Sequence, residues 1–189
     1  MSIYPPKIAK RFDSQANSGS FSSPSAMGSE VDFSCGVSLK FSLQIDPETK
    51  TITAAKFRTN GCGFVIAAAD LLSENITGSA LIDLHALQDQ EKELQQEFGG
   101  IPENRLHCFG LAMGALQNAL AEYRNSQAAE WEGEKALICT CFGISEEVIE
   151  KTIADENLST VEEVGASCNA GMGCGSCQFL IREILDTVS

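Results

Sequence analysis

The feature that most restricts this chain is a set of four cysteines near its end, arranged in two close pairs. The first pair is Cys139-Thr-Cys141, and the second is Cys174-Gly-Ser-Cys177. The chain has no other sign of a secreted protein, and in a reducing compartment paired cysteines bind metal more often than they form disulfides. The pattern therefore predicts a site for a thiophilic metal or an iron–sulfur cluster.

The spacing and the surrounding glycines favour an iron–sulfur cluster over zinc. A cluster needs four thiolates with backbone amides close to the sulfurs, and the glycines at 171, 173 and 175 allow this approach because they lack a Cβ. Cys177 also stands where the last helix is expected to start, and a helix N-terminus stabilises a thiolate. Zinc is the alternative, although its cysteine pairs are more often separated by about two to four residues.

The charge and the apolar segments exclude several classes of protein. The 189 residues carry a formal net charge of −13, which argues against binding to nucleic acid or to anionic membranes. The first residues contain no apolar core of a signal peptide, and the longest apolar run, 64–69, is too short to cross a bilayer. We therefore expect a cytoplasmic chain that binds neither nucleic acid nor membrane.

Alternating and periodic apolar residues predict a sheet followed by helices. Residues before about Val31 are rich in Ser, Gly and Pro and are expected to form a loop or arm, with a short helix near 6–12. Apolar and polar residues alternate over 37–45, and turn residues join this strand to a second one at 51–59, so a hairpin is expected. The remaining predicted elements are helices at 64–72, 79–98 and 106–124, a polar linker at 125–135, two capped helices that follow Ser145 and Thr160, and a final helix with an apolar stripe over 180–188.

Three further cysteines, Cys35, Cys62 and Cys108, each stand at the boundary of a predicted element. The start of a helix lowers the pKa of a thiol, so three such thiols at one end of a sheet would form an open metal site. His107, beside Cys108, is a fourth candidate ligand. The alternative is three cysteines buried in an ordinary core, which is hardest to reconcile with Cys62 between two glycines.

Cys168 and His85 are not expected to take part in a site. Cys168 falls on an apolar stripe and is interpreted as a small buried hydrophobic residue. His85 is interpreted as an ordinary helix residue. With only two histidines and no phosphate-binding glycine pattern, the chain is not expected to be a conventional enzyme.

Three segments near the end of the chain carry a family resemblance. They are Ile138-Cys-Thr-Cys-Phe-Gly-Ile-Ser-Glu-Glu, Thr160-Val-Glu-Glu-Val and Ala170-Gly-Met-Gly-Cys-Gly-Ser-Cys. Together they resemble the bacterioferritin-associated-ferredoxin type of 2Fe–2S domain, a helical domain that recurs in the middle of NifU proteins. The resemblance implies that Cys139, Cys141, Cys174 and Cys177 bind a permanent 2Fe–2S cluster.

A second resemblance extends over residues 1–126. Its segments are Cys35-Gly36, Phe57-Arg-Thr-Asn-Gly-Cys-Gly-Phe-Val-Ile-Ala and Ile101-Pro-Glu-Asn-Arg-Leu-His-Cys, with further matches at Tyr4, Asn17 and Gly19. They are similar to the N-terminal scaffold domain of IscU and NifU. The resemblance implies that Cys35, Cys62 and Cys108 bind a transient iron–sulfur cluster or zinc, that His107 is the neighbouring candidate ligand, and that Cys108 accepts persulfide sulfur.

Together the two resemblances indicate a NifU protein without the usual C-terminal Nfu-type domain. They imply an α+β fold in which an IscU-like antiparallel sheet packed with helices (1–126) is followed by a linker (127–136) and a small all-α 2Fe–2S domain (137–189). The implied function is that of a scaffold for assembly and transfer of iron–sulfur clusters, not of an enzyme. The implied partners are a cysteine desulfurase of the NifS or IscS type, apo iron–sulfur client proteins, an electron donor and a second copy in a homodimer.

Two departures from the family affect this interpretation. The family has Asp directly after its first Cys-Gly, where this chain has Val37, so the front site is expected to lack an easily exchanged oxygen ligand. Residues 101–105 replace the family's chaperone-binding segment, so engagement of a dedicated Hsp70 is not expected. The alternatives are a 2Fe–2S electron-transfer or redox-sensing protein whose N-terminal domain only docks, and a zinc-stabilised interaction protein.

Overall fold

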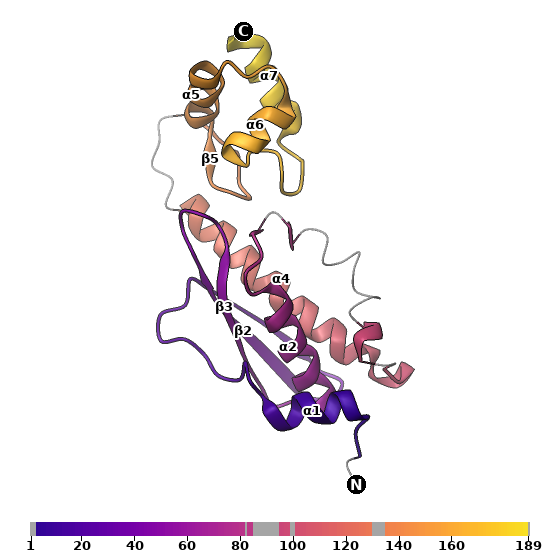
Figure 1. The fold of residues 1–189 in the computed structure, drawn as a ribbon. Helices are drawn as coiled ribbons and strands as arrows, with labels where there is room; N and C mark the ends of the chain where they lie inside the picture. The colour runs from indigo at the N-terminus through magenta and orange to yellow at the C-terminus, as the bar shows by residue number, and fades with distance from the viewer. Residues whose placement is uncertain (1–2, 82, 85–94, 99–100, 130–134, 189) are drawn as a thin grey trace. The chain divides into compact units, whose positions relative to one another are not determined.

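The computed structural model describes residues 3–81, 83–84, 95–98, 101–129 and 135–188 (Figure 1). The chain divides into two compact units. The first consists of Met1–Ala80 with Ala86–Tyr123, and the second consists of Leu81–His85 with Arg124–Ser189. The predicted helix at 79–98, and His85 within it, lie mostly outside the described residues.

A three-stranded antiparallel sheet forms the centre of the first unit. Its strands are β1 (Ala26–Asp32), β2 (Val37–Ile45) and β3 (Ile52–Thr59), in the order β1-β2-β3. Leu39, Phe41, Leu43 and Ile45 of β2 are buried, as the sequence pattern predicts for a core face, and Ser42 on the other face is buried as well. The hairpin of β2 and β3 is confirmed, and both strands pair in register around Phe41 and Phe57.

Strand β1 contradicts the prediction of a loop before Val31. Its residues alternate between buried and exposed, and it pairs with β2 along its whole length from Ala26 to Asp32. The Ser-, Gly- and Pro-rich composition predicted a loop, but Gly28 is needed here for packing, which strand propensity does not take into account. A Cβ at Gly28 would lie 2.0 Å from the backbone nitrogen of Ala119, so the strand and a helix touch backbone to backbone there.

Gly28→Ala is therefore expected to destabilise the first unit. The added Cβ would also lie 2.4 Å from the carbonyl oxygen of Ala115, and overpacking of this kind costs about 1–3 kcal/mol or more. Urea denaturation measures the loss. Gly110→Ala is the matched control, because a Cβ there meets nothing within 4 Å and alanine favours a helix over glycine by about 1 kcal/mol. Equal stability of the two variants would contradict the close packing.

Helices and a turn of 3-10 helix accompany the sheet within the described residues. They are α1 (Pro6–Ser14), α2 (Gly63–Ile76), η2 (Glu103–Arg105) and α4 (Leu106–Ala129). Helix α2 is buried on most sides and contacts both α1 and β3. Helix α4 continues to Ala129, so the first residues of the predicted linker are helical.

The second unit is helical, with one short ribbon that the sequence pattern did not predict. Its elements are β4 (Leu137–Cys139), β5 (Ile144–Ser145), α5 (Glu146–Glu156), α6 (Val161–Cys168) and α7 (Gln178–Val188). Both predicted caps are confirmed: the Ser145 hydroxyl accepts a hydrogen bond from Val148, and Thr160 forms a capping box with Glu163. Ile149, Val164 and Ile181 lie at the centre of the core.

Within the part of the chain that the structure describes, every helix is too short or too polar to cross a membrane.

Candidate functional site

The four cysteines of the second unit come together as two close pairs. Cys139 ends β4 and Cys141 lies in the turn that follows, whereas Cys174 and Cys177 lie in the loop between α6 and α7. The Cys141 thiol donates a hydrogen bond to Cys174, with 3.5 Å between the sulfurs. Cys139 lies close enough to Cys177 to raise its pKa. Segments that are more than thirty residues apart thus meet at one cluster of thiols.

Glycines in the α6–α7 loop are required by its geometry. Gly171 and Gly175 have φ angles of 82° and 74°, the left-handed region that side chains rarely adopt. A Cβ at Gly173 would lie 3.1 Å from the sulfur of Cys141. The expectation that these glycines let the backbone approach the sulfurs therefore holds at Gly173.

Burial decides the protonation of these thiols. Burial, and next the neighbouring Cys139, raise the pKa of Cys177 to about 11. Burial also raises the pKa of Cys141, whereas the Ser176 hydroxyl lowers that of Cys174. The sequence pattern predicted a stabilised thiolate at Cys177, which stands directly before α7 as expected, but desolvation outweighs the helix end. A bound cation has to displace these protons.

Cys168 lies outside this cluster of four. It is half-buried at the end of α6, and its thiol donates a hydrogen bond to the carbonyl of Val164 at 3.3 Å. Burial raises its pKa. These properties agree with the interpretation of Cys168 as a structural residue.

The three cysteines of the first unit are carried by three different parts of the fold. Cys35 lies in the turn between β1 and β2, Cys62 is the N-cap of α2, and Cys108 is in the first turn of α4. The Cys62 thiol lies close enough to Cys108 to raise its pKa, and the Cys108 sulfur lies 3.5 Å from Nε2 of His107. The tertiary structure thus brings Cys62, Cys108 and His107 together, with Cys35 close enough to affect the titration of Cys108.

Asn60 ties the turn that carries Cys35 to the turn that carries Cys62. Its Oδ1 accepts a hydrogen bond from the backbone N–H of Ser38 at 2.7 Å, and its Nδ2 donates one to the carbonyl of Gly36 at 3.1 Å. Gly36 lies in the turn between β1 and β2, and Ser38 lies at the start of β2, whereas Asn60 is two residues before Cys62. A single amide side chain therefore holds the two turns at a fixed separation.

Tyr4 closes the start of α2 beside Cys62. Its hydroxyl accepts a hydrogen bond from the backbone N–H of Gly63 at 3.1 Å, which satisfies one of the free donors of the helix end. A Cβ at Gly63 would lie 2.6 Å from the tyrosine ring. The ring also packs edge-on against Phe64. The glycine after Cys62 is thus required by the approach of Tyr4.

Asn17 and Gly19, the two other N-terminal residues of the family resemblance, stabilise the fold rather than the site. Asn17 donates to the buried carboxylate of Asp70 at 3.0 Å, and Arg11 forms an ion pair with the same carboxylate at 2.7 Å. Gly19, at a φ of 132°, donates to the carbonyl of Phe57 at 2.8 Å. These contacts fasten the N-terminal segment to α2 and β3.

Burial also dominates at Cys108. The residue is 3% exposed, and burial, followed by Cys62, raises its pKa to about 12. The sequence pattern predicted a lowered pKa at this helix start, but desolvation outweighs the helix dipole. Cys35, by contrast, is exposed.

The raised pKa of Cys108 is expected to make the reduced, chelator-treated protein less stable at alkaline pH. Below the ordinary thiol pKa of 9.0 the group is protonated in both the folded and the unfolded states. Between 9.0 and about 12 only the unfolded chain loses the proton, so the free energy of unfolding falls as pH rises through this window. Urea denaturation from about pH 8 to about pH 10 measures the slope. A Cys108→Ala variant with the same slope would contradict this origin.

The structure also brings Asp32 to the front site. One carboxylate oxygen of Asp32, the sulfur of Cys35 and a ring nitrogen of His107 all lie within 4.8 Å of one another. The sequence pattern missed Asp32 because β1 was predicted as an irregular segment, which has no defined face. The pairing of β1 with β2, which puts Asp32 opposite Val37, is the signal that could have revealed Asp32.

Comparison with known families decides what kind of chain this is. The model of the family described as NifU-like N terminal domain matches residues 3–130. The chain belongs to the NifU-like N-terminal domain family. A second family model, described as BFD-like 2Fe-2S binding domain, matches residues 137–187 of this NifU-like chain.

Individual proteins are similar to this NifU-like chain over much of its length. The nitrogen fixation protein NifU of Azotobacter chroococcum mcd 1 is 34% identical over 182 residues, which are 96% of this chain and 58% of that protein. The iron–sulfur cluster assembly scaffold protein IscU of Aquifex aeolicus (strain VF5) is 29% identical over 136 residues, which are 72% of this chain and 85% of that protein. The chain thus spans little more than half the length of the Azotobacter relative.

A solved structure supports the fold of this NifU-like chain. The crystal structure of a nitrogen-fixing NifU-like protein (N-terminal) from Brucella abortus is 17% identical, and the match has a TM-score of 0.53. It covers 65% of this chain and 95% of the other. The match agrees with the predicted antiparallel sheet packed with helices.

Proposed function

We propose that this chain is a scaffold for the assembly and transfer of iron–sulfur clusters. A labile cluster would form on Cys35, Cys62 and Cys108, with His107 beside them, and a permanent 2Fe–2S cluster would be held by Cys139, Cys141, Cys174 and Cys177. The observation that carries the proposal is the meeting of Cys62, Cys108 and His107 from two helix starts, next to an exposed cysteine. Relatives named NifU and IscU, the latter as a cluster assembly scaffold, support it.

The four cysteines of the second unit suit a resident cluster. Two iron atoms need four protein ligands, two on each iron, and the cysteines form two close pairs. Cys139 and Cys177 are 2% and 6% exposed, which protects a cluster from exchange. When bound, such a cluster supplies one-electron chemistry. The match to a 2Fe-2S binding domain over residues 137–187 supports this choice over zinc.

The cysteines of the first unit suit a cluster that is passed on. Cys35 is exposed and Cys62 is partly exposed, while Cys108 forms the buried floor. Their supports are loops and helix ends rather than the middle of a core. A ligand set open on one side can be reached by a client protein, and ligand exchange with the client's own cysteines would remove the cluster.

Sulfur delivery by a cysteine desulfurase of the NifS or IscS type is part of the proposal. A thiolate of the front site attacks the outer sulfur of the donor's persulfide, the donor's S–S bond breaks, and the donor cysteine leaves as a thiolate. The family resemblance points to Cys108 as the acceptor. Because Cys108 is 3% exposed, acceptance there requires the site to open, whereas Cys35 is already accessible.

The persulfide sulfur then needs two electrons to become sulfide. A cluster held by Cys139, Cys141, Cys174 and Cys177 would offer one-electron chemistry for this reduction, and an external electron donor would be the final source of the electrons. Assembly and release involve no catalytic residue, so the chain is proposed to be a carrier and not an enzyme.

The remaining parts of the proposal concern organisation. The scaffold domain is placed at 1–126, the linker at 127–136 and the cluster domain at 137–189. A homodimer in the cytoplasm, serving apo iron–sulfur client proteins, is proposed on the strength of the family resemblance. Zinc bound at the front site would occupy the ligands of the labile cluster while no cluster is present.

The test is anaerobic purification followed by desulfurase-fed assembly. We expect the purified chain to contain about two iron and two sulfide per chain in the resident cluster, with the absorption and EPR spectra of a 2Fe–2S protein. Addition of ferrous iron, cysteine and a desulfurase should build a second cluster that moves to an apo-ferredoxin. A colourless zinc protein, or a resident cluster with no second transferable one, would overturn the proposal; the latter result would favour electron transfer.

A further inference from the structure

The front site contains a mixed set of donor atoms apart from Cys62 and Cys108. Asp32, Cys35 and His107 offer one oxygen, one sulfur and one nitrogen within 4.8 Å of one another. Zinc binds these three types of atom at about 2.0–2.3 Å, which places ligand atoms about 3–4 Å apart on one ion. Small movements of exposed side chains would bring the three atoms to that spacing.

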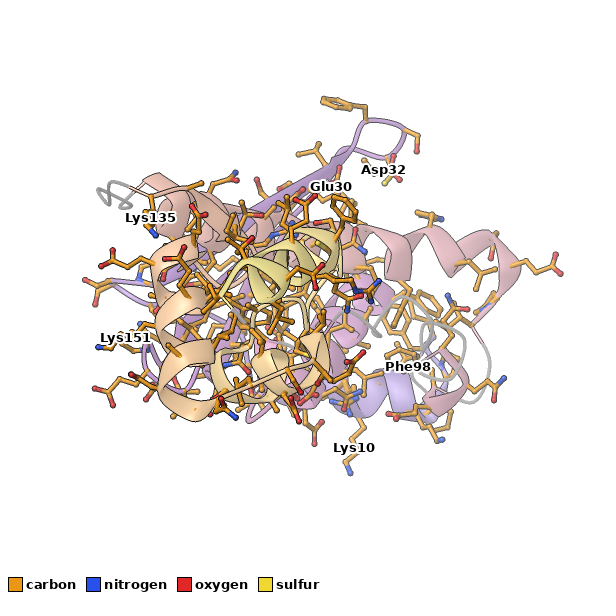
Figure 2. All side chains as sticks on the ribbon, turned by 90° about the horizontal axis from the view of Figure 1, so that it is seen from above. Lys10, Glu30, Asp32, Phe98, Lys135 and Lys151 are labelled. Atoms are coloured by element: carbon orange, nitrogen blue, oxygen red, sulfur yellow. The ribbon has the colours of Figure 1, made fainter. Side chains whose placement is uncertain are left out.

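The strand register explains why Asp32 points to this site. Asp32 pairs directly with Val37, so the two side chains leave the same face of the sheet with Cβ atoms about 4.5–5.5 Å apart. Gly28 and Glu30, earlier on the same face of β1, lie against α4. Asp32 continues this row at the end of the strand, beside Glu30 (Figure 2).

The direction of α4 brings His107 to the same place. Glu30 lies beside Gly114, where an added Cβ would be 3.1 Å from the glutamate Oε2. His107 is seven residues, or about two turns, before Gly114, so it leaves nearly the same side of the helix. Asp32 is two residues after Glu30 on the same face of β1, and His107 is two turns before Gly114 on the same side of α4. Asp32 and His107 therefore come together.

Hydrogen bonds hold the Asp32 carboxylate in position. Its Oδ1 accepts from the backbone N–H of Ser34 at 2.8 Å and from the Ser34 hydroxyl at 2.5 Å. Partners of this kind orient a metal ligand before the metal arrives.

We propose that Asp32 is an oxygen ligand of the front site and binds a divalent metal ion together with Cys35 and His107. This inference rests on the function proposed above and deepens it. The site would have an exposed half, formed by Cys35 with the partly buried Asp32, and an inner half, formed by the buried Cys108 with the partly exposed Cys62. His107 joins them, because its Nε2 lies 3.5 Å from the Cys108 sulfur.

Asp32 thereby supplies the carboxylate that position 37 lacks. Val37 is apolar, and its cross-strand partner carries the acid on the same face. A carboxylate is a harder ligand than a thiolate, so the bond to Asp32 is the contact that opens first when an ion or cluster leaves. The exposed half is where exchange begins.

Zinc binding by the full chain, with its resident cluster in place, tests the inference. Equilibrium dialysis measures the zinc affinity, and X-ray absorption at the zinc edge reports the ligand shell without interference from iron. We expect Asp32→Asn to weaken zinc binding by at least about tenfold and to remove one oxygen or nitrogen neighbour from the shell. Glu30→Gln is the matched control, an acid two residues earlier on the same face, and should leave both readouts unchanged.

A rescue variant separates a ligand from a structural role. Asp32→Asn combined with Val37→Asp moves the carboxylate to the paired position and should restore affinity and the lost neighbour. An unchanged affinity and shell in Asp32→Asn, an equal loss in Glu30→Gln, or failure of the rescue would overturn the role of Asp32 and leave the scaffold function standing. A wild-type chain that takes neither zinc nor a second cluster at the front site would overturn both.

Discussion

Replacing Cys139 and Cys177 together with serine is expected to remove the resident cluster and to unfold most of the unit that contains α5, α6 and α7. Both side chains point into the core of this unit, beside Ile149 and Ile181. A core of this size supplies no more than about 3–5 kcal/mol, whereas a bound structural metal contributes on the order of 10 kcal/mol in small domains. The cluster is therefore expected to be a condition of folding for this unit.

Hydrogen exchange followed by mass spectrometry measures the effect segment by segment. Peptides from 137–188 should exchange freely in the double variant, while those from β2 and α2 keep their protection. Cys168→Ser is the matched control, because it removes a half-buried thiol of the same unit that lies outside the two pairs. A colourless double variant that keeps full protection over α5–α7 would show that the core folds without a cluster.

Cys62→Ala is expected to abolish desulfurase-fed assembly of the labile cluster while the resident cluster persists. The Cys62 side chain makes no capping hydrogen bond to α2, so its removal leaves the helix start intact. It also removes the thiol that lies beside Cys108. Loss of a ligand should reduce assembly by more than the roughly 10- to 100-fold that loss of a supporting residue causes.

Absorption spectra recorded before and after desulfurase-fed assembly separate the two clusters. The starting spectrum of Cys62→Ala should equal that of the wild type, and the increase on assembly should be absent, as should transfer to an apo-ferredoxin. Cys168→Ala loses a thiol in the other unit and should assemble and transfer normally. Normal assembly by Cys62→Ala would place the labile cluster elsewhere.

Local signals in the sequence were sufficient where neighbouring residues determine the structure. The cap at Ser145 and the capping box of Thr160 and Glu163 form as predicted, because each connects residues within one helical turn. The hairpin of β2 and β3 follows from alternation and turn chemistry. The two cysteine pairs of the tail indicated a metal site for the same reason: their spacing is short.

Other properties depend on contacts between distant segments. Strand β1 was predicted as a loop, because glycine at position 28 is unfavourable in a strand by its propensity alone. The packing of α4 against Gly28 shows why glycine is required there. Cys108 and Cys177 stand near helix starts, where a lowered pKa was expected, yet burial raises both values. Desolvation depends on what packs around a thiol, and that is a property of the whole fold.

By itself the sequence indicated candidate metal ligands: four cysteines in two pairs, and three more at the boundaries of predicted elements. It also determined most elements, because capping and periodicity act over a few residues. Only the tertiary structure decided which side chains meet and how exposed they are. It placed Cys62 beside Cys108, left Cys35 at the surface and paired Asp32 with Val37 across the strands. The reason is that strand register and helix packing set side-chain positions across long separations in the chain, where no local pattern reaches.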